Sequence, residues 1–228
     1  MGPMSRTLEV IVTNTADARA AADGGADRLE LIAAPHLGGM TPSPAVVASV
    51  QAETDLPVRV MIRRTESHRL AQQTIDALVA DVESLPMATE FVCGAVDEDG
   101  MPDAVLEQLI AAFAGRRWTF HRAVDDAPDL LAAVAAALQL TGCDQVLTAG
   151  DAGGVDSGFP RLATALADPS LAPGLLIGGG VTVDNLPPLL AAGAHGIHLG
   201  RVVRAAGSWD QPVRADLVRA AAELVHAH

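Results

Sequence analysis

The sequence predicts an α/β protein that forms a single-domain (β/α)8 TIM barrel. Segments of strand character and of helix character alternate eight times along the 228 residues, as they do in such a barrel. Turns such as Gly24-Gly25-Ala26-Asp27 recur before strands, and glycine commonly ends a helix in the left-handed conformation. A doubly wound open sheet is the alternative, although it usually has fewer βα units. We assign the barrel to residues 7–228 and residues 1–6 to a disordered or non-native N-terminal segment.

The first four units combine short apolar or alternating strands with Ala-rich or amphipathic helices. Their strands are predicted at 8–13, 27–32, 57–63 and 89–95, and their helices at 15–23, 42–53, 70–84 and 102–113. In the second unit, Thr41 is the expected N-cap of the helix, with Pro42 at its first helical position.

The last four units begin with the most informative strand of the chain. There Trp118 and Phe120 alternate with Thr119 and His121, so that apolar and polar side chains take opposite faces. The four strands are predicted at 117–121, 144–148, 175–178 and 196–199, and their helices at 128–140, 159–167, 184–192 and 211–226. His121 ends its strand just before a helix, which is where parallel α/β proteins place their chemistry.

The composition argues against several classes of function. All 15 basic residues are arginine, so no lysine is present to form a Schiff base. The net charge of −13 and the aromatic content of 3% disfavour nucleic acid as a partner. The sequence has neither an apolar run of membrane-spanning length nor a signal-peptide core. We expect a cytoplasmic protein without a membrane partner, in which Cys93 and Cys143 are ordinary reduced thiols.

In several predicted strands the polar residues occupy alternate positions, so their side chains share one face of the strand. We expect this face to point toward the barrel axis. Glu9, Glu30 and His121 are the candidate acid/base residues, whereas Arg28 and Arg63 can neutralise the carboxylates or hold an anion. A buried ion-pair network without chemistry is the alternative. Convergence from at least five strands favours a ligand site, because barrel interiors are mainly aliphatic.

Two glycine-containing loops follow the seventh and eighth predicted strands. Gly179 and Gly180 lie in the first loop, and Gly200 and Arg201 lie in the second. Loops at these positions often bind phosphate through backbone N–H groups that glycine leaves accessible. The alternative is that these glycines only form tight turns.

Other polar residues near the predicted strand ends complete the candidate ligand site. They are Thr41, Ser43, Thr119, Arg122, Asp125, Thr148 and His198. For Asp125, a solvated turn is the alternative interpretation. We expect a small anionic ligand or a metal ion as partner, and a homodimer remains an open alternative.

Seven motifs, in order, resemble those of the CutC family. They are Leu8-Glu9-Val10, 25–31, 38–43, 60–63, 119–125, 147–150 and 178–181. The resemblance extends from residue 8 to about residue 200, and it implies a (β/α)8 barrel with a copper-homeostasis role in the cytoplasm.

The resemblance also implies copper as the bound ion. Cu(I) prefers thiolate and thioether ligands, and the candidates here are Cys93 and Met61. Family members often have a cysteine where this chain has Ile32. The segment His198-Leu199-Gly200-Arg201 also departs from the family pattern, in which a small residue and a serine follow the histidine.

Two functions therefore remain open. The first is a CutC-type copper-homeostasis protein that binds the metal. The second is an isomerase, epimerase or lyase, without a Schiff base, that acts on a small phosphorylated or carboxylated metabolite at the C-terminal face of the barrel.

Overall fold

Eight parallel strands close into a barrel in the computed structural model, which describes residues 6–85 and 90–227. Each strand pairs with its neighbour in sequence, and the first pairs with the last. The strands are β1 (Thr7–Val12), β2 (Arg28–Leu31), β3 (Val58–Met61), β4 (Glu90–Cys93), β5 (Trp118–Phe120), β6 (Cys143–Thr148), β7 (Leu175–Ile177) and β8 (Gly196–Leu199). The predicted (β/α)8 fold is confirmed.

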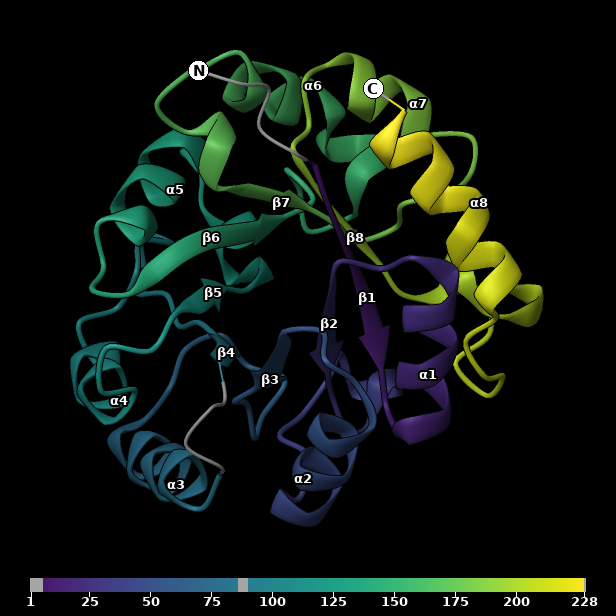
Figure 1. Ribbon diagram of the computed structural model, residues 1–228. Helices are drawn as coiled ribbons and strands as arrows, with labels where there is room; N and C mark the ends of the chain where they lie inside the picture. The colour runs from purple at the N-terminus through teal and green to yellow at the C-terminus, as the bar shows by residue number, and fades with distance from the viewer. Residues whose placement is uncertain (1–5, 86–89, 228) are drawn as a thin grey trace.

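The helices surround this ring of strands (Figure 1). They are α1 (Thr15–Gly24), α2 (Pro44–Glu53), α3 (Gln72–Glu83), α4 (Leu106–Ala112), α5 (Leu130–Leu138), α6 (Val155–Leu166), α7 (Leu186–Ala191) and α8 (Ala215–His226). Short 3-10 helices occupy several connections: η1 (Pro35–Leu37), η2 (Arg122–Asp126), η3 (Ala172–Gly174), η4 (Arg201–Val203) and η5 (Ala205–Gly207). Among the described residues, no helix is both long and apolar enough to cross a membrane.

Several predicted helix starts are wrong. Helix α4 begins at Leu106 rather than at 102, and α8 begins at Ala215 rather than at 211. Helix α2 begins at Pro44, and its N-cap is Ser43, whose side chain accepts a hydrogen bond from the backbone N–H of Val46. Thr41 instead exchanges hydrogen bonds with the backbone of Arg63. Pro44, rather than Pro42, occupies the first helical position. Helix α6 begins at Val155 rather than at 159 and contains Pro160, a residue that usually indicates a helix start.

Some predicted boundaries lie outside the described residues. These are positions 1–5 of the N-terminal segment, the start of the fourth strand at 89, and the last residue, 228. The described part of the fourth strand begins at Glu90.

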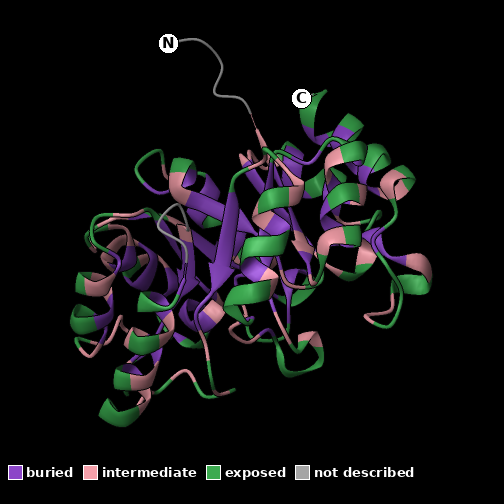
Figure 2. Cartoon of the chain, turned by 60° about the horizontal axis from the view of Figure 1, so that its bottom comes forward, coloured by how far each residue is buried: buried purple, intermediate pink, exposed green. Residues whose placement is uncertain are grey.

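The apolar interior has two parts. The larger part lies between the strands and the helices, and it includes Trp118, Phe120 and Cys93. A small second cluster contains Met61 and Val92, together with Ile32 and Ile11. Figure 2 shows the buried strands at the centre and the exposed faces of the helices turned outward. In β4, Cys93 belongs to the larger part and its neighbour Val92 to the small cluster, because successive side chains of a strand point to opposite faces.

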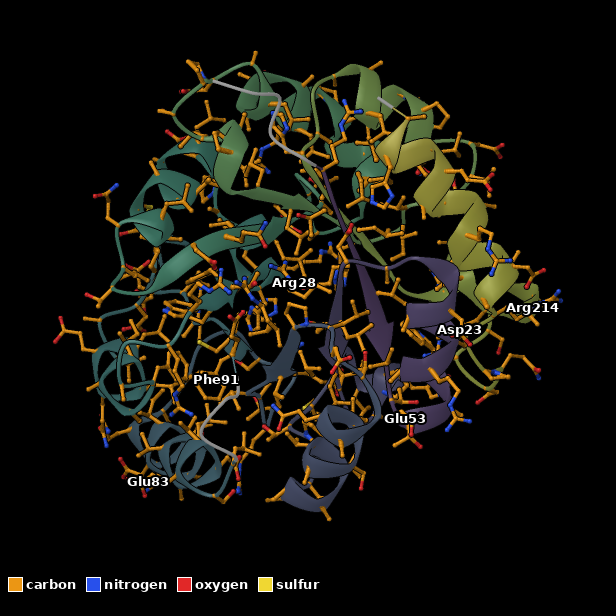
Figure 3. All side chains as sticks on the ribbon, in the orientation of Figure 1. Asp23, Arg28, Glu53, Glu83, Phe91 and Arg214 are labelled. Carbon is orange, nitrogen blue, oxygen red and sulfur yellow. The ribbon has the colours of Figure 1, made fainter. Side chains whose placement is uncertain are left out.

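Charged pairs fill the barrel near the N-terminal ends of the strands. The Arg59 guanidinium is fully buried, and it lies 3.1 Å from Glu90 and 2.7 Å from Asp144. Arg59 also donates a hydrogen bond to Thr119, while Arg28 donates to Gln145. In Figure 3, Arg28 lies within the ring of strands, whereas Glu53, Glu83 and Arg214 lie at the periphery. This layer occupies one end of the barrel interior, so a ligand has access from the other end.

The Arg59 layer yields a stability prediction. Arg59→Met should lower the free energy of unfolding by about 2–4 kcal/mol, because it leaves buried polar partners without their cation. Arg117→Met is the matched control, since Arg117 pairs with the same Glu90 but its side chain is 64% exposed. That control should cost less than about 1 kcal/mol. Urea unfolding of both variants measures the difference, and equal losses would contradict the assigned role of Arg59.

Candidate functional site

A cavity of about 880 Å³ opens at the C-terminal ends of the strands. It is lined by many of the residues that the sequence singled out: Glu30, Met61, Arg63, His121, Arg122, Asp125, Gly179, Gly180, His198, Gly200 and Arg201. This is the end of a (β/α)8 barrel at which enzymes of this fold carry out their chemistry.

The other candidates lie beneath or beside the cavity. Thr119 and Arg28 belong to the polar layer below, and Glu9 lies just under the cavity floor. Thr148 faces η2 rather than the axis, because its hydroxyl donates to Asp125 at 2.6 Å. Three candidates remain. Thr41 holds the connection before α2, and Ser43 caps α2. Cys93 packs in the outer core.

Glu30 and His198 line the floor of the cavity, and Glu9 lies directly beneath them. His198, Glu9 and Glu30 come from the adjacent strands β8, β1 and β2, respectively, and all three are nearly fully buried. His198 Nδ1 donates to Glu9 Oε1 at 2.8 Å, and its Nε2 lies 3.6 Å from Glu30 Oε2. Arg28 donates to the second oxygen of Glu9. The imidazole therefore lies between two carboxylates, only one of which is also paired with an arginine.

The two carboxylates have opposite pKa shifts. Burial alone raises the pKa of Glu9, but Arg28 and His198 outweigh burial and hold it well below its ordinary value. For Glu30, burial dominates, the negative charge of Glu9 adds to it, and the pKa rises to about 7. Burial lowers the pKa of His198, yet Glu30 and Glu9 more than compensate and raise it. At neutral pH, Glu9 is thus a fixed anion, and Glu30 can gain or lose a proton.

Glu30 also has a free hydrogen-bonding position. Its Oε1 atom is buried and has no hydrogen-bond partner among the described residues. A buried polar atom without a partner is costly, and such atoms concentrate at functional sites. Glu30 also lines the cavity, so its carboxyl group lies next to the space that a bound molecule would fill.

His121 reaches the cavity from the end of β5. Its Nδ1 accepts a hydrogen bond from the Ala123 N–H at 3.2 Å, so the ring caps the start of η2. Gly94 makes room for the ring, since a Cβ there would lie 2.7 Å from His121 Nδ1. Burial and the nearby positive charge of Arg63 keep the pKa of His121 well below its ordinary value. The imidazole is therefore neutral.

Asp125 organises the wall between β5 and β6. It accepts hydrogen bonds from the Thr148 hydroxyl and from the backbone N–H groups of Ala149 and Gly150, and it pairs with Arg122 at 2.8 Å. The Arg122 guanidinium packs directly against Gly179, where a Cβ would lie 2.7 Å from it. Asp125 and Arg122 thus hold the wall in place through contacts within the protein.

The glycine loops contain unused hydrogen-bond donors. The backbone N–H groups of Gly179 and Gly180 bond no other residue that the structure describes. Both residues have positive φ, 90° and 96°, a conformation that favours glycine. Arg201 lies exposed at the rim, and its side chain has no partner within the described chain. Free N–H groups beside a free guanidinium are suited to an anion.

Two further cavity residues, His68 and Trp209, are not among the candidates predicted from the sequence. The ring centroid of His68 lies 5.3 Å from that of His121, and His68 Nδ1 donates to Asp126 at 2.7 Å. Trp209 also lines the cavity, and a Cβ on Gly200 would lie 2.6 Å from its ring. Both belong to connections after strands, and that position is the only signal in the sequence that pointed to them.

The soft copper ligands proposed from the sequence lie on different sides of the sheet. Met61 lines the cavity, whereas the Cys93 thiol is buried in the outer core, where burial raises its pKa far above the ordinary value. Within the described residues, no three His, Cys, Asp or Glu side chains are grouped as metal ligands. The residues present at the cavity therefore do not fit a thiolate copper site.

Comparisons with known proteins identify the family. The CutC family model matches residues 6–203. A CutC family protein of Klebsiella pneumoniae (strain 342) is 35% identical over 209 residues, which cover 89% of this chain and 81% of the relative.

Solved structures show the same fold. The CutC structure from Streptococcus agalactiae, named for copper homeostasis, has a TM-score of 0.75 at 23% identity and covers 86% of this chain and 98% of that one. Phosphoribosyl anthranilate isomerase from Thermococcus kodakaraensis has a TM-score of 0.64 at 15% identity, covering 98% and 100%. At these identities the likeness concerns the fold alone. The family match and the Klebsiella relative together establish that this chain belongs to the CutC family.

Proposed function

We propose that this protein is an acid/base enzyme that acts on a small phosphorylated or carboxylated metabolite. The observation that carries the proposal is Glu30, a buried carboxyl group at the cavity floor with a free Oε1 and a pKa of about 7. A general acid or base works best when its pKa lies near the operating pH. The reaction is of the isomerase, epimerase or lyase type, and the absence of lysine excludes a Schiff base.

His198 and Glu9 support Glu30 in this role. Glu9 accepts the Nδ1 proton of His198, which directs Nε2 of the imidazole toward Glu30. The positive charge of His198 then offsets part of the burial penalty on the Glu30 carboxylate. Glu30 can thus accept a proton from a substrate and later return it without leaving its position.

The anion of the substrate is held by the loops that follow β7 and β8. We assign it to the N–H groups of Gly179 and Gly180 and to the Arg201 guanidinium, which have no partners among the described residues. Backbone N–H groups and an arginine together form charge-assisted hydrogen bonds with phosphate oxygens.

Copper binding is the second candidate function. It is supported by the name of the Streptococcus agalactiae relative and by the Met61 side chain at the cavity. The buried and protonated Cys93 thiol argues against it. For either function we propose a cytoplasmic location, which the free cysteines Cys93 and Cys143 support.

The anion site is tested by calorimetry with inorganic phosphate. Arg201→Ala should weaken phosphate binding about tenfold, because one charge-assisted hydrogen bond is lost. Arg219→Ala removes an exposed arginine on α8 that binds the Asp23 carbonyl, and it should leave the affinity unchanged. The assignment fails if the unaltered protein does not bind phosphate at millimolar concentration or if both variants bind equally well.

The carboxylates of Glu30 and Glu9 should affect stability in opposite ways. The pKa of Glu30 is raised in the folded state, so its ionisation reduces stability as pH rises through about 7. Glu30→Gln should therefore stabilise the protein at pH 8 by about 1–3 kcal/mol and have little effect at pH 5.

Glu9 provides the matched comparison. Its pKa is lowered, so its contribution to stability is present above the unfolded-state pKa and is lost only as pH falls through the lower folded-state value. Glu9→Gln should accordingly destabilise the protein at pH 8. Chemical denaturation at both pH values checks the pair, and shifts of the same sign at pH 8 would contradict the assignment.

The copper function is tested separately by Cu(I) competition with a chromogenic chelator under anaerobic conditions. Copper held by the soft ligands should be lost in the double variant Cys93→Ala and Met61→Leu. Tight Cu(I) binding that survives both substitutions would rule out these two ligands.

A further inference from the structure

The orientation of His121 determines which of its nitrogen atoms faces the cavity. Nδ1 accepts the Ala123 N–H and so cannot carry a proton in this arrangement. The proton must be on Nε2, which forms no hydrogen bond with any described residue. Because the ring lines the cavity, the Nε2–H group is available to a ligand.

Packing holds the ring in this orientation. Gly94 lies against Nδ1 and Cε1, where a Cβ would come within 2.7 Å and 2.9 Å of them, respectively. The His68 ring covers another side at 5.3 Å, and the Phe120 ring lies at 6.2 Å in an edge contact. His68 is itself fixed by Asp126. The donor is therefore preorganised, which is the property that makes electrostatic stabilisation effective in a transition state.

The charges around His121 disfavour a second proton on the ring. Arg63 and Arg122 also line the cavity, and the His68 ring lies beside that of His121 at a tilt of 46°. Burial, then Arg63, then His68 lower the pKa of His121. The imidazole can thus donate a hydrogen bond through Nε2–H, but it is a poor source of a full proton for a leaving group.

We infer that Glu30 and His121 form a catalytic pair for enolisation of a small phosphorylated carbonyl compound, with Glu30 as the base and the neutral His121 as the hydrogen-bond donor to the carbonyl oxygen. This inference rests on the proposed function and narrows it to an isomerase or epimerase. It joins three residues or loops that line one cavity: Glu30, whose buried Oε1 lacks a partner, His121 with its free Nε2–H, and the glycine loops with their free N–H groups.

The step balances without any further reactant. The Glu30 carboxylate removes the proton from the carbon next to the carbonyl, and the C–H electron pair becomes the carbon–carbon double bond. The carbonyl π electrons move to oxygen, where the His121 Nε2–H stabilises the negative charge. For isomerisation, the substrate carries a hydroxyl group on the carbon that loses its proton. The hydroxyl proton moves to the adjacent enolate oxygen, and Glu30 returns its proton to the former carbonyl carbon, which forms the new carbonyl group on the neighbouring carbon. For epimerisation, the enolate turns its opposite face to Glu30 before the proton returns to the same carbon.

The first test is the protonation state of His121, measured by two-dimensional ¹⁵N–¹H NMR on the full chain labelled at histidine. His121→Asn assigns the resonance, and its Oδ1 can still accept the Ala123 N–H. We expect a neutral ring with the proton on Nε2 throughout pH 6 to 8, since the pKa is lowered well below its ordinary value. A proton on Nδ1, or a cationic ring at pH 7, would overturn the inference.

The second test compares 2-phosphoglycolate, whose planar carboxylate imitates an enediolate, with inorganic phosphate. The unaltered protein should bind 2-phosphoglycolate at least about tenfold more tightly than phosphate, and the ligand should shift the His121 Nε2 resonance. His121→Asn should remove most of this advantage and leave phosphate affinity unchanged.

The outcomes separate the two proposals. One outcome is that phosphate binds while 2-phosphoglycolate binds no more tightly, or while its advantage over phosphate is the same in His121→Asn as in the unaltered protein. In either case the enolisation pair is wrong and the anion site stands. If neither compound binds, both the proposed function and this inference are wrong.

Discussion

The hydrogen bond from His198 to Glu9 determines the chemistry of the cavity floor. It fixes the imidazole between two carboxylates, and together with Arg28 it keeps Glu9 ionised although the residue is buried. Glu30 lacks such an arginine contact, so burial controls its pKa. Two chemically identical groups on adjacent strands thereby acquire different roles, one as a fixed charge and one as a group that exchanges protons near neutral pH.

The rest of the barrel supports the difference in charge between Glu9 and Glu30. The Arg59 layer fills the lower interior with paired charges, and the cluster around Met61 and Val92 provides apolar packing between it and the opening. The connections after the strands then build the walls, with Asp125 and Arg122 bracing one of them. The cavity thus presents Glu30, the N–H groups of Gly179 and Gly180, and the Arg201 guanidinium with hydrogen-bonding capacity that no described residue uses.

The sequence predicted the barrel and much of the cavity lining because both follow local rules. Strand and helix patterns alternate in a fixed order, and the C-terminal ends of parallel strands meet at one face. That is why Glu30, His121 and the glycine loops could be named beforehand. Thr148 could not be placed, since β6 shifts its register against β5 and turns this side chain toward Asp125. His68 was missed because its connection carries no motif.

The sequence by itself determined the fold class, the polar parity of the strands, the absence of lysine and the resemblance to the CutC family. Only the tertiary structure decided which charges are paired. It placed Cys93 in the outer core, gave Glu9 an arginine partner and left Glu30 Oε1 without one. The physical reason is that pairing and desolvation depend on distances across neighbouring strands, and hydrophobic periodicity along a single strand carries no information about them.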